Sequence, residues 1–142
     1  MEKFAARIAS LLLCSCAWAE PVHKLDAVAD QNWMLVSQDS KPAAYAKTTL
    51  RITNDGKVSG RAPVNSYGGQ ITLDGQGGCK WGNGFIATRM AGAPELMDAE
   101  QKYFEALPKT AKVDLSNGVL TFSTADGQTK VVFHQAPSEK RQ

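Results

Sequence analysis

The chain has 142 residues, enough for one domain with its own hydrophobic core. It is 43% hydrophobic and 21% charged, a composition that excludes an intrinsically disordered protein. Its formal net charge of +2 excludes the strongly basic surface of a nucleic-acid-binding domain, and no run of 18 apolar residues predicts a transmembrane segment.

The N-terminal segment, residues 1–19, has the pattern of an export signal. Two basic residues precede a short apolar stretch, and the Ala-Trp-Ala sequence of residues 17–19 fits cleavage after Ala19. We therefore predict a periplasmic or secreted mature chain. The alternative is lipid anchoring at Cys16, because the Leu-Cys-Ser-Cys sequence of residues 13–16 resembles an imperfect lipoprotein signal.

Cleavage after Ala19 leaves Cys79 as the single thiol of the mature chain, so no internal disulfide is expected. A free cysteine packs like a small hydrophobic residue, and we expect Cys79 to be buried or half-buried. The hydrophobic core must then supply the stability of the domain.

Alternating apolar and polar residues predict strands in the first two thirds of the chain. A polar N-terminal arm, residues 20–31, comes first. The strand segments that follow are 32–36, 48–53, 57–61, 70–74 and 85–90.

Glycine, asparagine and proline mark the breaks between these strands. Asn54-Asp55-Gly56 predicts a tight hairpin turn, and Gly68-Gly69 predicts a second turn of the chain. Gly60 lies inside a strand, which indicates a bulge or a close backbone approach. Pro63 cannot donate to a ladder, so pairing should stop there.

A single helix is predicted over residues 94–107. Pro94 is tolerated at its first position and Pro108 stops it. Its apolar stripe comprises Leu96, Met97, Tyr103, Phe104 and Leu107.

The last third of the chain is predicted to be an antiparallel meander. Turns at Asn117-Gly118 and Asp126-Gly127 separate alternating runs at 111–115, 120–122 and 131–133. Strands before and after one helix predict a β-rich α+β domain over residues 32–135, followed by a flexible tail, residues 136–142.

Several short motifs occur in a fixed order along the chain. They are Trp33-Met34-Leu35, the Gly-containing turn from Asp55 to Gly60, Asn65-Ser66-Tyr67, Thr88-Arg89-Met90-Ala91, and a helix with Glu100 in its apolar stripe. This order resembles the META/HslJ-like domain of bacterial envelope proteins, over about residues 33–133.

The resemblance implies a curled or cracked antiparallel β-barrel with one helix. It also implies an exported or lipid-anchored protein with links to envelope stress or secretion, and it brings no established catalytic residues. Many members carry a cysteine before the asparagine and another after the Met-Ala pair. Here those positions hold Val64 and Gly92, so any function of that cysteine pair is absent.

The sequence offers little for catalysis or for a cofactor. The histidines, His23 and His134, lie far apart, and no nucleophile motif such as G-x-S-x-G occurs. One cysteine and two scattered histidines do not form a zinc site. We therefore expect a non-enzymatic protein with no metal and no cofactor.

Glu100 is the most unusual residue, since a carboxylate on an apolar helix face must be paired or hydrogen-bonded. One hypothesis is a perturbed acid in a pocket. The other, which we favour, is a structural acceptor for backbone N–H groups between Gly60 and Tyr67, or for Arg89. Asn65 is expected to serve a local turn.

Tyr67 and Trp81 are flanked by glycines and could form an aromatic ligand surface, although core packing of at least one is expected. Two functions remain open. The first is a monomeric envelope accessory protein that binds a protein partner through a surface or sheet edge. The second is a module that binds a small apolar ligand or lipid inside the curled sheet.

Overall fold

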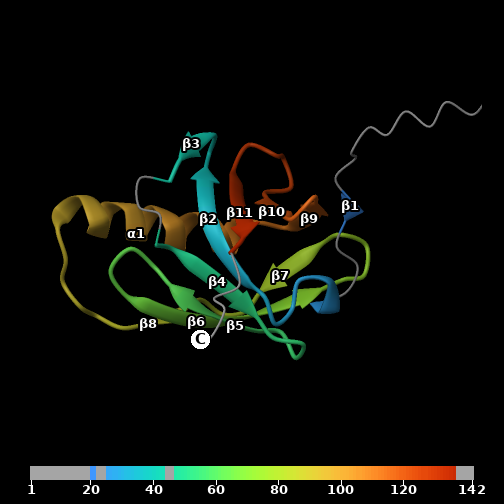
Figure 1. Cartoon of the computed structure of the whole chain (residues 1–142), viewed down its shortest axis with the longest axis horizontal. Helices are drawn as coiled ribbons and strands as arrows, with labels where there is room; N and C mark the ends of the chain where they lie inside the picture. The colour runs from blue at the N-terminus through green and yellow to red at the C-terminus, as the bar shows by residue number, and fades with distance from the viewer. Residues whose placement is uncertain (1–19, 22–24, 44–46, 137–142) are drawn as a thin grey trace, which may run out of the picture.

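The computed structural model describes residues 20–21, 25–43 and 47–136 (Figure 1). The predicted export signal, with Cys16 and Ala19, and the tail after Ala136 lie outside the described residues, as does His23. The described strands are β1 (Glu20–Pro21), β2 (Asn32–Gln38), β3 (Lys41–Pro42), β4 (Thr49–Ile52), β5 (Lys57–Arg61), β6 (Ser66–Leu73), β7 (Cys79–Trp81), β8 (Ile86–Ala87), β9 (Lys112–Ser116), β10 (Val119–Ser123) and β11 (Lys130–Gln135). The helices are η1 (Leu25–Ala27), α1 (Pro94–Ala106) and η2 (Leu107–Lys109), which continues α1.

The strands form one antiparallel sheet in the order β1-β9-β10-β11-β2-β4-β5-β6-β7, with β3 added beside β2 and β8 beside β6. The sheet curls until its ends nearly meet. There the N–H of Cys79 donates to the C=O of Ala111 over 2.9 Å, and Val113 donates to Gly77 over the same distance. The expected barrel-like sheet with one main helix is therefore confirmed, and α1 lies along one side of it (Figure 1).

The interior of the barrel is filled by the apolar residues that alternate along the strands. The side chains of Trp33, Leu50 and Ile52 are at most 1% exposed, and those of Phe122 and Phe133 are fully buried. The rings of Phe122 and Phe133 meet edge to face, with centroids 5.9 Å apart. None of the described helices is long and apolar enough to span a membrane.

The core begins earlier than the alternation of the sequence indicated. The expected N-terminal arm supplies β1, which pairs with β9, and it also supplies Val28, which is only 1% exposed. The indole N–H of Trp33 donates to the C=O of Val28 over 3.0 Å. This segment therefore closes the core at the start of β2.

The prediction of a turn at Gly68-Gly69 is wrong, because β6 runs straight through both residues. A Cβ atom on Gly69 would lie 2.7 Å from the ring of Phe85. The glycine leaves room for an aromatic ring above the strand and does not bend the chain. Pattern reasoning cannot separate these two uses of glycine.

Three other expectations need correction. The expected strand 85–90 is reduced to β8. The N–H of Thr88 still donates to the C=O of Ser66 in β6, but the N–H of Met90 donates to the side chain of Asn65 instead of to a strand. Cys79–Trp81, which lies between the predicted strands 70–74 and 85–90, forms β7. Met97, expected in the apolar stripe, is 37% exposed.

Turn positions agree with the sequence. Gly56 has a φ of 84°, and its N–H donates to the C=O of Thr53 over 3.0 Å. Asn117 and Gly118 both have positive φ, at 49° and 76°, as a two-residue hairpin loop requires. The segment between the predicted strands 32–36 and 48–53 was expected to be a loop, but β2 continues to Gln38 and β3 pairs back onto it.

Gly60 provides the close backbone approach that the sequence predicted. Its pairing with Tyr67 is regular, but a Cβ atom here would lie 2.1 Å from the carbonyl oxygen of Thr49 and 2.9 Å from the hydroxyl of Tyr67. Only a residue without a side chain lets β4 and the Tyr67 hydroxyl come this close.

We predict that Gly60→Ala lowers the free energy of unfolding by about 3 kcal/mol, because the new methyl group meets rigid backbone. Gly68→Ala is the matched control. Its Cβ would approach the C=O of Val58 to only 3.3 Å, so the expected loss is under about 1 kcal/mol. Urea denaturation of both variants tests this, and equal losses would contradict the steric explanation.

Candidate functional site

Glu100 lies on the inner face of α1, where the 3.6-residue period of the helix places it between Leu96 and Phe104. It is only 5% exposed. A carboxylate so far from water is stable only if hydrogen-bond donors replace its hydration. The prediction that Glu100 faces the sheet is therefore confirmed.

Within the part of the chain that the structure describes, all the donors to Glu100 come from the turn between β5 and β6. The backbone N–H groups of Val64 and Asn65 donate to Oε2 over 2.8 Å each, and the Asn65 side-chain Nδ2 donates to Oε1 over 2.6 Å. These backbone donors are free because Pro63 interrupts the ladder. The structural hypothesis for Glu100 correctly located them.

Asn65 extends the contact to a third part of the chain. Its side-chain Oδ1 accepts from the N–H of Met90 over 2.7 Å and from the hydroxyl of Thr88 over 2.9 Å. We call the set of Val64, Asn65, Thr88, Met90 and Glu100 the Asn65–Glu100 network. It joins the β5–β6 turn, the segment after β8 and α1, so Asn65 does more than serve a local turn.

Arg89 does not contribute to this network. It is exposed, and the three donors to Glu100 are all supplied by residues 64 and 65. The suggested Arg89 contact is therefore wrong, since the turn residues already supply the donors to the carboxylate.

Tyr67 packs in the core together with Tyr103. The Tyr67 hydroxyl donates to the C=O of Thr49 over 2.8 Å and lies 2.5 Å from the Tyr103 hydroxyl. Tyr67 uses its single proton on Thr49, so Tyr103 must be the donor between the two rings. Burial raises the pKa of Tyr67 and of Tyr103 well above the usual range, so both stay neutral.

Trp81 is 8% exposed, and its indole N–H donates to the hydroxyl of Thr110 over 2.8 Å. Cys79 lies two residues before Trp81 on β7 and is half-buried, as expected. Burial raises the pKa of its thiol to about 11. Such a thiol carries little thiolate near neutral pH and is a poor nucleophile. Tyr67 and Trp81 are both core residues, and neither forms an exposed aromatic surface.

Val64 and Gly92, the two positions where the sequence departs from the resemblance, lie against each other. A Cβ atom on Gly92 would be 2.8 Å from Cγ2 of Val64. The branched valine therefore fills the space opposite the glycine. Sequence reasoning named both positions but gave no reason to place them in contact.

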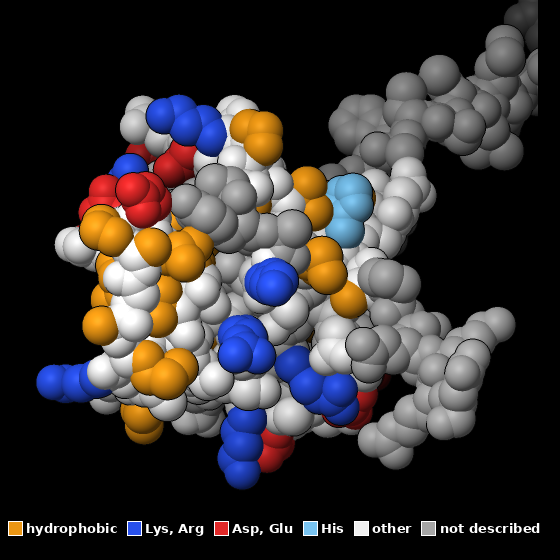
Figure 2. Space-filling model, turned by 60° about the vertical axis from the view of Figure 1, so that its left-hand side comes forward, with side chains coloured by type: hydrophobic (Ala, Val, Ile, Leu, Met, Phe, Trp, Pro, Cys, Tyr) orange, Lys and Arg blue, Asp and Glu red, His pale blue; other side chains and the backbone are white. Residues whose placement is uncertain are grey.

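Three apolar side chains around this network are exposed. Ile86 of β8 is 84% exposed, Met90 is 54% exposed and Met97 of α1 is 37% exposed. We call these three residues the apolar face. Figure 2 shows hydrophobic side chains gathered on the side of the molecule that α1 covers, below a group of acidic side chains.

Among the described residues, no group of three or more His, Cys, Asp or Glu side chains is close enough to hold a metal ion. His134 lies exposed on β11.

The profile of the META domain family matches residues 26–137. No curated protein matches the chain. Three solved structures share its fold. An NMR structure of a protein from Burkholderia xenovorans has a TM-score of 0.64 at 20% identity and covers 80% of this chain and 86% of its own.

A second NMR structure has a TM-score of 0.62 at 24% identity, with 80% and 95% of the two chains covered. The crystal structure of a DUF4847-family protein from Bacteroides vulgatus has a TM-score of 0.63 at 12% identity, with 81% and 99% covered. At these identities the likeness establishes the fold alone.

We predict that Glu100→Ala lowers the free energy of unfolding by about 3 kcal/mol, because three buried donors lose a charged acceptor. Glu100→Gln should cost less, since its carbonyl oxygen can still accept from both backbone N–H groups. Glu105→Ala is the control on an exposed position of the same helix, with an expected loss under about 0.5 kcal/mol. Thermal and urea unfolding measure all three, and a Glu100→Ala variant as stable as the control would contradict the structural role.

Proposed function

This chain belongs to the META domain family, and from that premise we propose that it is a non-enzymatic accessory protein of the bacterial envelope that binds another protein through its surface. Its unusual acid, Glu100, and its two candidate aromatics, Tyr67 and Trp81, are all engaged in holding the fold. The residues with free surface are therefore the better candidates for function.

The observation that carries the proposal is the apolar face beside the edge of β8. Within the described part of the chain, β8 pairs with β6 alone, so one side of this two-residue strand has no partner strand. An open strand edge next to exposed apolar side chains suits a protein partner, because it offers both backbone hydrogen bonds and hydrophobic contact.

A ligand-binding module is the second function that the sequence left open. Its expected site was the interior of the curled sheet, which is occupied by Trp33, Phe122, Phe133 and the aliphatic residues around them. Small barrels whose interiors are filled by side chains have no room for an internal ligand. The packed core therefore favours the surface-binding function.

Export to the periplasm is part of this proposal. A role linked to envelope stress or secretion is also part of it, because the resemblance to the family implies one. It is supported by the cleavage pattern that ends at Ala19, and lipid anchoring at Cys16 is the alternative.

We predict that the protein purified from the envelope fraction has the mass of a chain beginning at Glu20, because the small residues before it suit a signal peptidase. Intact-mass spectrometry measures this directly. A lipid-modified N-terminus at Cys16 would show lipid anchoring in place of cleavage after Ala19. An intact Met1 would contradict export.

We also predict that a photo-crosslinking amino acid at position 86 or 90 forms an adduct of one defined size in living cells. The same group at Val36, an exposed apolar residue of β2 outside the apolar face, is the matched control and should form none. Ile86→Lys should remove the adduct at position 90 without unfolding the chain, since the side chain is 84% exposed. Equal adducts at positions 36 and 86, or none at either, would contradict the proposal.

A further inference from the structure

A groove separates α1 from the β2–β3 hairpin, and none of its lining residues belongs to the apolar face. Its volume is about 550 Å³, within the usual range for small-molecule sites. Leu35 and Tyr103 line its floor and Ala99 lines the helix wall. At one end the two walls are tied together, because the side-chain N–H of Gln38 donates to the backbone C=O of Lys102 over 3.1 Å.

Thr48 also lines this groove, and its side chain is the one buried polar group that the described residues leave unsatisfied. The residue is 1% exposed, and its hydroxyl Oγ1 has no hydrogen-bond partner. A buried hydroxyl without a partner costs free energy, and such exceptions need an explanation. This oxygen has less than 1 Å² of accessible surface, so a ligand in the groove would supply the missing bond once the Thr48 side chain turns toward it.

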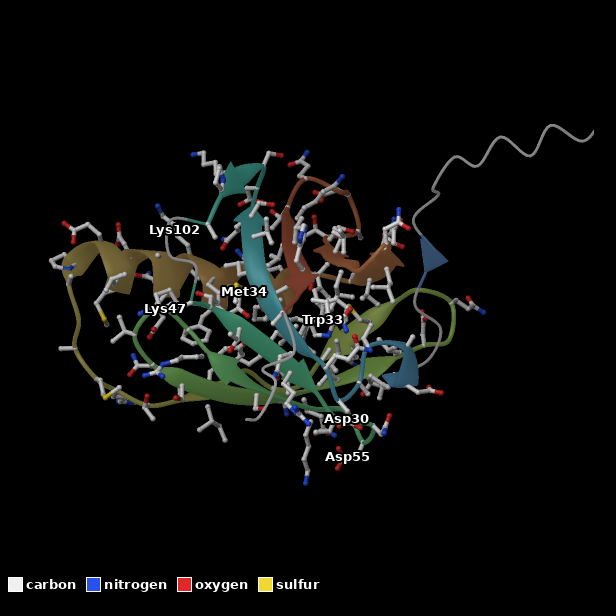
Figure 3. All side chains as sticks on the ribbon, in the orientation of Figure 1. Asp30, Trp33, Met34, Lys47, Asp55 and Lys102 are labelled. Atoms are coloured by element: carbon white, nitrogen blue, oxygen red, sulfur yellow. The ribbon has the colours of Figure 1, made fainter. Side chains whose placement is uncertain are left out.

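The charged side chains of the groove are separated by sign along the helix. Glu95 and Asp98 lie on its first two turns, whereas Lys102 lies beyond them, on the side of α1 toward β3 (Figure 3). Lys41 of β3 lies at this second end, since its strand partner is Gln38.

None of these four side chains forms a salt bridge within the described residues. The basic end also contains Asp39, whose carboxylate accepts from the backbone N–H of Lys130 over 3.3 Å. That bond directs one of its oxygens toward the first residue of β11. The groove therefore has an acidic end, an apolar floor with one free hydroxyl, and a mainly basic end.

We propose that this groove binds a short peptide of about three residues. Its ammonium group would lie at Glu95 and Asp98, its carboxylate at Lys41 and Lys102, and one of its backbone amides on the hydroxyl of Thr48. The dimensions agree. Glu95 and Lys102 are seven residues apart, or roughly 10 Å along a helix, which is about the length of an extended tripeptide.

The test is a titration of the full mature chain with trialanine, followed by NMR. The backbone signals of Thr48, Ala99 and Lys102 should shift and saturate together. N-acetyl-trialanine and trialanine amide each lack one terminal charge, and each should bind about two- to fivefold more weakly than trialanine. Equal binding of all three peptides, or shifts that never saturate, would overturn the proposal.

Thr48→Val separates binding from folding. The variant keeps the shape of the side chain and should bind trialanine about three- to tenfold more weakly, because one hydrogen bond is lost. Without ligand it should unfold at a temperature no lower than the native protein, since the hydroxyl has no partner to lose. A lower unfolding temperature, or unchanged affinity, would overturn the role of Thr48.

Lys102→Met tests the basic end, with an expected loss of about two- to fivefold in affinity. Lys80→Met is the matched control, because Lys80 is an exposed lysine of β7 outside the groove, and it should leave binding unchanged. Equal effects of the two variants would overturn the assigned orientation. Phosphoethanolamine, a zwitterion of similar charge, should bind more weakly than trialanine, and tighter binding would overturn the assignment to a peptide.

Discussion

The buried carboxylate of Glu100 is the interaction on which the arrangement of this fold depends. A charge on the inner face of α1 would be too costly without donors, and among the described residues the β5–β6 turn supplies all of them. The helix is therefore fixed to one place on the barrel. Because Asn65 also holds the segment after β8, one network determines where three separate parts of the chain meet.

A second constraint is the hydrogen bonding between Tyr67 of β6 and Tyr103 of α1, which lie shortly after Asn65 and Glu100 in the chain. The hydroxyl of Tyr67 reaches the backbone of β4 only because Gly60 has no side chain. The same hydroxyl accepts a hydrogen bond from the hydroxyl of Tyr103 in α1. Backbone, sheet and helix are thus connected by a short chain of neutral hydrogen bonds. Such bonds are strong in a buried site, and it is burial, which raises the pKa of both side chains, that keeps the two tyrosines from ionising.

These constraints explain why the functional features are at the surface. The motif residues Asn65, Tyr67 and Glu100 hold the helix to the sheet, and aromatic rings fill the barrel. What remains exposed is the apolar face beside β8 and the charged groove between α1 and the β2–β3 hairpin. Both surfaces border α1 but they share no residue, so a protein partner and a small ligand would contact different side chains.

The sequence alone determined the strand alternation, the tight turns and the helix, because these depend on neighbouring residues and on the φ values that glycine and asparagine tolerate. It also located Glu100 and its acceptor role, since the 3.6-residue period puts a charge on an apolar stripe and Pro63 frees nearby donors. Tertiary structure decided the rest. Three features depend on contacts between residues far apart in the chain. They are whether Gly68-Gly69 bends the chain or admits Phe85, which of Arg89 and Asn65 meets the Glu100 carboxylate, and the absence of a partner for the Thr48 hydroxyl. A local pattern contains no information about those distances, and only the closed barrel sets them.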